Sequence, residues 1–139
     1  MLASFPMSRT VPVVAIVDDE DAVRRALERL LRSAGIDPQV FSSGETFLAS
    51  LARRPPDCVV LDLHMPGVTG FDVQTRMNAS GYRVPVIVIT GHDTAESRER
   101  VRALGAAAYL RKPVGARVLL DAIGRATGDH PAEPEEEKR

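Results

Sequence analysis

Three aspartates stand at the ends of apolar runs in this sequence, where they are candidates for a reactive site. Asp18 and Asp19 follow the run VVAIV, and Asp62 follows CVVL. Carboxylates that lie close together repel one another and raise at least one pKa, unless a cation lies among them. Mg²⁺ suits such a site, because it prefers a few carboxylate oxygens together with water and phosphate oxygens. Taken alone, Asp62 has an alternative role, since Asp often only caps a turn.

Thr90 and Lys112 follow two further apolar stretches, VPVIVI and AAYLR. A hydroxyl and an ammonium can both donate hydrogen bonds to the oxygens of a bound anion. A carboxylate nucleophile, a divalent cation, an ammonium and a hydroxyl together favour phosphoryl transfer onto Asp62.

The apolar runs are typical of strands in a parallel sheet that is covered on both faces, and between them apolar residues recur at helical spacing. The predicted strands are Val13–Val17, Asp37–Phe41, Cys58–Asp62, 84–89 and 107–111. The predicted helices span about 21–34, a segment to about 54 that opens with a capping box of Ser42 and Glu45, and about 71–79, 94–104 and 115–126.

Five strands alternating with five helices predict an α/β fold with right-handed crossovers. Because there is no glycine-rich nucleotide motif, we expect the flavodoxin-like order 2-1-3-4-5 for the doubly wound sheet. That order makes strands one and three neighbours, which brings Asp18 and Asp19 beside Asp62. Turn capping alone then no longer accounts for Asp62.

Size and composition limit the function further. A chain of 139 residues forms one domain, and a net charge of -1 provides no basic field for nucleic acid or an anionic membrane. The single cysteine, Cys58, allows no intrachain disulfide and indicates a reducing compartment. The start of the chain has neither a signal-peptide nor a transmembrane pattern, so we expect a cytoplasmic protein.

The ends of the chain differ from its centre. Residues 1–10 form a loose leader in this interpretation, 11–127 the folded domain, and 128–139 an acidic, proline-containing tail that we expect to be disordered. The short tail favours a natural end, although PAEPEEEKR could also open a linker.

The motifs VDDE at 17–20, LDLHMPG at 61–67, VITG at 88–91 and RKP at 111–113 occur in an order and spacing that resemble the receiver domain of two-component response regulators. The resemblance covers about residues 11–127. The TGHD stretch is similar to the subgroup whose output is often a helix-turn-helix domain, and this sequence contains no such domain.

The resemblance implies a role for each matching residue. Asp62 would accept the phosphoryl group, Asp19 would bind Mg²⁺ directly, Asp18 would hold it through water, and the backbone carbonyl of His64 would complete the protein's share. Lys112 would pair with Asp62 when the site is empty and with a phosphoryl oxygen when it is loaded. Thr90 would bond another oxygen, and the resemblance also assigns phosphate binding to Leu63 and Gly91. It further implies a cis Lys112-Pro113 bond.

Switching is also implied by the resemblance. Phosphorylation would draw Thr90 inward, Tyr109 would fill the space behind it, and the surface of the fourth helix, fifth strand and fifth helix would change. The alternative for Tyr109 is a partly buried strand aromatic with its hydroxyl in water.

His64 and His92 flank the site in sequence. A Zn²⁺ or nucleophilic role for either lacks correctly spaced soft ligands. We expect their side chains to shape the access of water to the phosphoryl group. His130 lies in the tail and receives no role.

We therefore expect a phosphorelay protein that takes its phosphoryl group from a histidine kinase or histidine phosphotransfer protein and acts on a downstream protein target. It would not be a turnover enzyme, and it would be a monomer or a phosphorylation-dependent dimer. One alternative is a phosphorylation-independent interaction module on the same fold. The other is an aspartyl-phosphate phosphatase, which would need a general acid where this sequence has His64.

Overall fold

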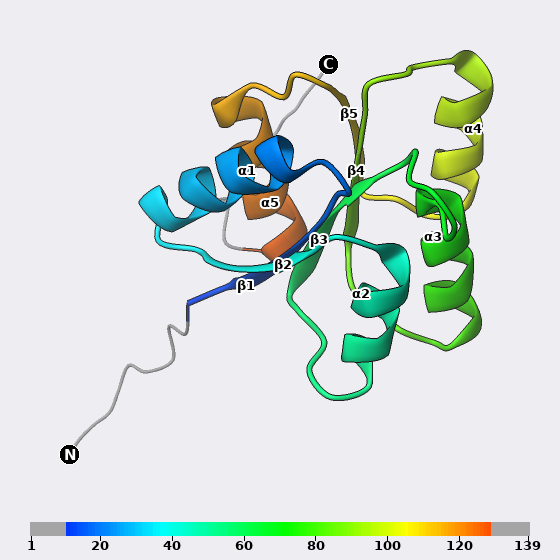
Figure 1. Cartoon of the computed structure of the whole chain (residues 1–139), viewed down its shortest axis with the longest axis horizontal. Coiled ribbons are helices and arrows are strands. Elements are labelled where there is room, and N and C mark those ends of the chain that lie inside the picture. The colour runs from blue at the N-terminus through cyan, green and yellow to red at the C-terminus, as the bar shows by residue number, and fades with distance from the viewer. Residues whose placement is uncertain (1–10, 129–139) are drawn as a thin grey trace.

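The chain forms a parallel sheet with a layer of helices on each face (Figure 1). In a computed structural model, which describes residues 11–128, the five strands lie in the order β2-β1-β3-β4-β5. This confirms the predicted flavodoxin-like fold. The strands are β1 (Val13–Val17), β2 (Asp37–Phe41), β3 (Cys58–Asp62), β4 (Val86–Thr90) and β5 (Ala108–Arg111). The helices are α1 (Asp21–Ser33), α2 (Gly44–Leu51), α3 (Gly70–Ala79), α4 (Ala95–Ala103) and α5 (Ala116–Thr127).

Successive residues of the central strands point into two separate apolar cores, as expected where side chains alternate between the faces of a sheet. Val60 and Ile87 pack with Leu31 of α1 and Leu119 of α5. The intervening residues, such as Val59, pack toward α2, α3 and α4. Figure 1 shows the same division, with α1 and α5 on one side of the sheet and the other three helices on the opposite side.

The register of the sheet aligns the carboxyl ends of its central strands. Val17 of β1 lies opposite Leu61 of β3, and Asp62 lies opposite Ile89 of β4. Ligands of open α/β sheets bind at this edge. Residues that follow the strands are therefore brought together although they are far apart in sequence.

The predicted capping box of Ser42 and Glu45 is wrong. The N-cap of α2 is Ser43, whose hydroxyl accepts a hydrogen bond of 3.2 Å from the backbone N–H of Thr46. Both adjacent serines are favoured N-cap residues, and the side chain that reaches the third helical N–H decides between them. The helix also ends at Leu51, before the predicted end near residue 54.

Three strand boundaries also differ from the prediction. β4 begins at Val86, because Pro85 has no N–H to donate to a ladder, and it includes Thr90. β5 begins at Ala108.

A capping box that the sequence analysis missed opens α3, where Thr69 and Asp72 each bond the other's backbone N–H.

The predicted leader 1–10 and all of the predicted tail except Gly128 lie outside the described residues. Gly128 follows α5 with φ 76°, a left-handed conformation that glycine adopts readily. Within residues 11–128, no helix combines the length and the apolar character that crossing a bilayer requires.

Gly70 begins α3 directly against the end of β3. A Cβ atom at this position would lie 2.6 Å from the carbonyl oxygen of Asp62 and 2.8 Å from the Cα of Leu63. Both neighbours are backbone atoms, so they could move aside only if the end of β3 moved as well.

We predict that Gly70→Ala lowers the free energy of unfolding by about 1 to 3 kcal/mol, the usual range for overpacking a close contact. Urea denaturation measures the change. Gly91→Ala is the matched control, since its added Cβ would meet Lys112 Cδ only at 3.8 Å, and we expect a change of about 0.5 kcal/mol or less. Equal stability of the two variants would contradict the packing argument.

Candidate functional site

Three carboxylates meet where β1 and β3 end. Asp18, Asp19 and Asp62 each place one oxygen within 4.8 Å of the others, and we refer to them as the acidic cluster. Asp18 is fully buried and Asp62 is 3% exposed, whereas Asp19 is open to solvent. The pairing of β1 with β3 thus assembles the group of acids that the sequence predicts.

Lys112 supplies the positive charge beside this cluster. Its ammonium nitrogen lies 2.9 Å from Asp18 Oδ2, 3.1 Å from Glu20 Oε1 and 3.3 Å from Asp62 Oδ1. The expected ion pair with Asp62 is present, but Lys112 shares its charge among three carboxylates. The Lys112-Pro113 peptide bond, directly after β5, is cis.

The loop that carries Asp18 is held by backbone contacts as well as by charge. Asp18 Oδ1 accepts a hydrogen bond from the backbone N–H of Glu20 at 2.9 Å. Arg24 donates from Nη1 to the carbonyl oxygen of Asp18 at 2.8 Å and from Nη2 to Asp21 Oδ1 at 2.9 Å. The guanidinium therefore fixes the peptide group that joins Asp18 to Asp19.

Thr90, Leu63 and Gly91 lie at the same edge of the sheet. The Thr90 hydroxyl accepts a hydrogen bond from the backbone N–H of His92 at 3.0 Å and lies 3.3 Å from the carbonyl oxygen of that residue. Leu63 donates its N–H to Ile89 at 3.1 Å, and its side chain is buried in the core. Gly91 is exposed, with room for a group above it. Their predicted contacts with a phosphoryl group stay predictions.

The imidazoles of His64 and His92 stand at the mouth of the site. Their ring centroids are 5.6 Å apart and the rings meet edge to face. Both residues line a hollow together with Asp19, Glu20, Asp62, Gly91 and Lys112. The two histidines, predicted separately from two loops, therefore form one pair above the acidic cluster.

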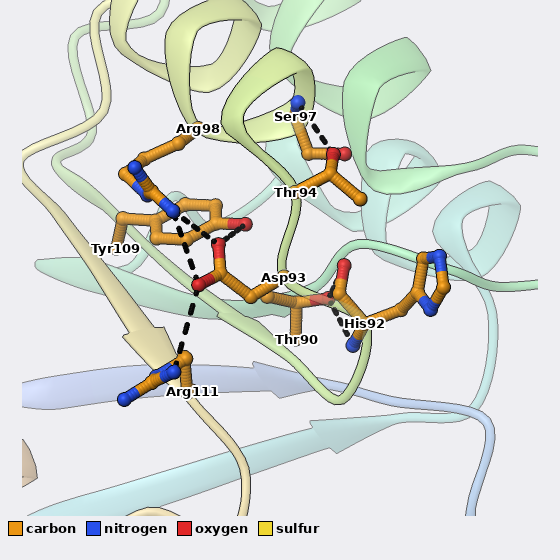
Figure 2. A network of polar contacts seen from close by, with 8 residues as sticks. All are labelled: Thr90, His92, Asp93, Thr94, Ser97, Arg98, Tyr109 and Arg111. Atoms are coloured by element: carbon orange, nitrogen blue, oxygen red, sulfur yellow. Dashed lines mark hydrogen bonds and ion pairs between the residues drawn. The ribbon is translucent and has the colours of Figure 1, made fainter.

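Tyr109 is partly buried on β5, and its hydroxyl donates to Asp93 Oδ1 at 2.9 Å (Figure 2). Both oxygens of Asp93 also lie 3.2 Å from Arg98 Nη2, and Oδ2 lies 3.8 Å from Arg111 Nη1. We call these four residues the Asp93 network. Tyr109 is thus a partly buried strand aromatic, as its alternative role describes, but its hydroxyl has a protein partner in Asp93 that the sequence analysis missed.

Burial, followed by the charge of Asp18, raises the pKa of Asp62 to about 6, although Lys112 acts in the opposite direction. For Lys112, burial by itself would lower the pKa. The hydrogen bond to Asp18 and the charge of Asp62 outweigh burial, so the pKa of Lys112 is raised. A single ammonium thus leaves the negative charge of the acidic cluster only partly compensated.

The acidic cluster fits a hard divalent cation such as Mg²⁺. All three residues offer carboxylate oxygens, the donors that this ion prefers. Asp18 Oδ2 is buried and lies 2.9 Å from the ammonium of Lys112, which also contacts Glu20 and Asp62. Such an oxygen is suited to a further positive partner.

A family model of the response regulator receiver domain matches residues 14–124. The chain belongs to this family. The receiver domain is a signalling module of two-component systems, so the assignment from the four sequence motifs is confirmed.

Two solved structures and one curated protein illustrate the similarity. The response regulator protein TodT of Pseudomonas putida is 37% identical over 120 residues, which cover 86% of this chain and 53% of TodT. The response regulator StyR is 38% identical with a TM-score of 0.77, over 86% of this chain and 60% of StyR. The structure titled FixJ-N is 31% identical with a TM-score of 0.80, over 89% of this chain and 99% of that one.

The receiver domain spans about half the length of the curated relatives TodT, nodulation protein W and FixJ. Their similarity agrees with the predicted subgroup, in which receivers often accompany helix-turn-helix domains. Besides the residues to which the sequence assigned a role, this receiver domain uses Glu20 as a partner of Lys112 and Arg24 as a support of Asp18. The position of Glu20 directly after the two aspartates was the available signal for the first. Only the tertiary contact reveals the second.

The raised pKa of Asp62 makes the stability of the receiver domain depend on pH. The folded-state pKa of about 6 exceeds the ordinary value of 3.8, so the unfolded chain releases this proton first as the pH rises. The contribution of Asp62 to stability is therefore fully present below pH 3.8 and is lost as the pH rises toward 6.

We predict that Asp62→Asn, which cannot ionise, increases the free energy of unfolding at pH 7 by about 2 kcal/mol, and that the gain shrinks as the pH falls toward 4. Denaturation in buffer containing a chelator measures the difference. Asp57→Asn, at the opposite end of β3, serves as the control and should show no such gain. A gain at pH 7 that persists unchanged at pH 4 would contradict the electrostatic explanation.

Proposed function

We propose that this receiver domain accepts a phosphoryl group on Asp62. The observation that carries the proposal is the arrangement of the buried Asp62 carboxylate in the acidic cluster, 3.3 Å from the ammonium of Lys112. A nucleophilic carboxylate needs compensating positive charge, both to stay ionised and to approach an anionic donor.

The transfer forms one bond and breaks one. An oxygen of Asp62 attacks the phosphorus atom, and the bond from phosphorus to the donor atom breaks as the donor leaves with its electron pair. The product is an acyl phosphate on Asp62. Lys112 and the Thr90 hydroxyl, which lie at the ends of β5 and β4 on one side of β3 in the sheet, bind phosphoryl oxygens, and Leu63 and Gly91 border the phosphoryl group.

Mg²⁺ belongs to the proposal. Asp19 and Asp62 would hold it directly, Asp18 would hold it through water, and the backbone carbonyl of His64 would complete the protein ligands. When bound, the ion supplies positive charge that offsets the negative charge of the acidic cluster and of the phosphoryl oxygens.

The partners follow from the family. We propose that a histidine kinase or a histidine phosphotransfer protein donates the phosphoryl group in the cytoplasm. The surface of α4, β5 and α5 would change on phosphorylation, and a downstream protein would recognise the changed surface. Thr90 and Tyr109 would carry the change to that surface. The domain would react with its own Asp62 and would not turn over a separate substrate.

His64 and His92 would set the lifetime of the phosphorylated state. Their edge-to-face pair borders the hollow through which water would reach the phosphoryl group. An unchanged rate of dephosphorylation in His92→Ala would remove His92 from this role.

The test of the acceptor is covalent labelling. We predict that radiolabelled acetyl phosphate with Mg²⁺ labels the wild-type chain, and that Asp62→Asn abolishes the label because an amide is not a nucleophile under these conditions. Asp57→Asn, in which the exposed carboxylate before β3 is replaced, should be labelled like wild type. Full labelling of Asp62→Asn would exclude Asp62 as the acceptor.

Arg24 provides a test of the cation site that does not depend on labelling. Its side chain is 19% exposed and holds the Asp18 carbonyl, whereas Arg25 is 71% exposed and pairs only with Asp21 among the contacts described. The two arginines are adjacent and share one partner, so they form a matched pair.

We predict that Arg24→Ala weakens Mg²⁺ binding about tenfold, the lower end of the range for residues that position ligands, and that Arg25→Ala changes it less than twofold. Isothermal titration with Mg²⁺ measures both constants, and circular dichroism checks that each variant is folded. Equal effects of the two substitutions would show that only overall charge matters.

A further inference from the structure

Two residues of the proposed switch are attached to neighbouring residues of one loop. The Thr90 hydroxyl accepts from the backbone N–H of His92, and the Tyr109 hydroxyl donates to the carboxylate of Asp93 (Figure 2). Thr90 lies at the end of β4 and Tyr109 lies on β5, opposite Val88. The loop between β4 and α4 thus bonds both side chains through consecutive residues.

Asp93 is held in place from three sides. Arg98 of α4 contacts both of its oxygens, Arg111 of β5 approaches one of them, and Tyr109 donates to the other. The Asp93 side chain is only 19% exposed, whereas those of Arg98 and Arg111 are 56% and 74% exposed. The Asp93 carboxylate is therefore the central member of the network, and the two arginine side chains approach it from the solvent-exposed side.

We propose that Asp93 is a positioning residue that couples the occupancy of the Asp62 site to the position of the Tyr109 side chain. In the empty site, Asp93 retains Tyr109 through the hydroxyl hydrogen bond. Occupancy of the site weakens this bond through the loop. This inference rests on the proposed phosphorylation of Asp62 and adds to it a role for Asp93 that the sequence motifs did not assign.

The coupling follows from the bonds that Thr90 must exchange. A Thr90 hydroxyl that donates to an anion on Asp62 can no longer point its hydrogen at the carbonyl of His92. If its oxygen moves as well, the N–H of His92 loses its acceptor. Asp93 is the next residue, with its Cα about 3.8 Å from that of His92. A displacement of His92 therefore reaches the carboxylate that holds Tyr109.

A simpler role for Asp93 makes a different prediction. An acid just before the N-cap Thr94 also stabilises α4 through the helix dipole and through its ion pair with Arg98. That role does not involve the Tyr109 hydroxyl. Tyr109→Phe, which removes only this hydroxyl, therefore separates the two roles.

Tyr109 can be observed almost directly, because the chain has two tyrosines and no tryptophan. In a Tyr82→Phe background, tyrosinate absorbance and tyrosine fluorescence report Tyr109 alone. Burial and the bond to Asp93 raise the pKa of Tyr109. Asp93→Ala should lower this pKa in the empty protein, and an unchanged pKa would overturn the inference without touching the acceptor role of Asp62.

The main experiment titrates the empty protein with beryllofluoride, which stands in for the phosphoryl group, in the presence of Mg²⁺. If occupancy must weaken the bond between Asp93 and Tyr109, that bond reduces the apparent affinity of the wild-type chain. We expect Asp93→Ala and Tyr109→Phe each to bind beryllofluoride about three- to tenfold more tightly, the effect of one hydrogen bond. The double variant should bind no more tightly than either single variant, because both remove the same bond.

Glu96→Ala, an exposed acid in the first turn of α4, is the control for charge and should leave the affinity unchanged. Unchanged or weaker binding by Tyr109→Phe overturns the inference, as do independent, additive effects of the two substitutions. A wild-type chain that fails to bind beryllofluoride overturns the proposed function and the inference together. Normal wild-type binding without an effect of the variants overturns the inference alone.

Discussion

The charge balance around Lys112 is the constraint on which the site depends. Burying the carboxylates of Asp18 and Asp62 is costly unless positive charge lies beside them, and Lys112 contacts both. Burial and the charge of Asp18 raise the pKa of Asp62 despite Lys112, and a single ammonium leaves part of the negative charge of the acidic cluster uncompensated. This residual negative charge gives a divalent cation a physical reason to bind. The cation would in turn reduce the repulsion between the acidic cluster and an anionic donor, so that each would bind better in the presence of the other.

The sheet meets this constraint because it is rigid where the charges must be close. β1, β3 and β4 are buried on both faces, and their parallel register holds Asp18, Asp62 and Thr90 at one edge. The helices differ in how firmly they are attached. α1, α2, α3 and α5 each bury two or more residues, whereas α4 buries Val101. A stable reactive edge is thus combined with a helix that few apolar contacts hold in place.

The loop between β4 and α4 connects the stable edge of the sheet to the less firmly attached helix α4. It begins at a buried strand end and continues into the helix with the fewest buried residues. Its contacts to Thr90 and Tyr109 are hydrogen bonds, which can be exchanged at a modest change in free energy, unlike the apolar packing of the sheet. A change of charge at Asp62 therefore has a short path to the surface of α4 and β5 that does not require the core to rearrange.

The sequence by itself determined the strands, their order, the family and the residues of the acidic cluster with Thr90 and Lys112. These follow from local patterns, since apolar runs define buried strands and the residue after each run must lie at the sheet edge. Only the tertiary structure decided which charges pair: the sharing of Lys112 with Asp18 and Glu20, the support of Asp18 by Arg24, and the bond from Tyr109 to Asp93. Side-chain pairing depends on distances between elements, which sheet register and helix packing set and which no local pattern contains. The same reason explains why position 70 needs a glycine. The need comes from the nearby backbone at the end of β3 and not from the residues next to Gly70 in sequence.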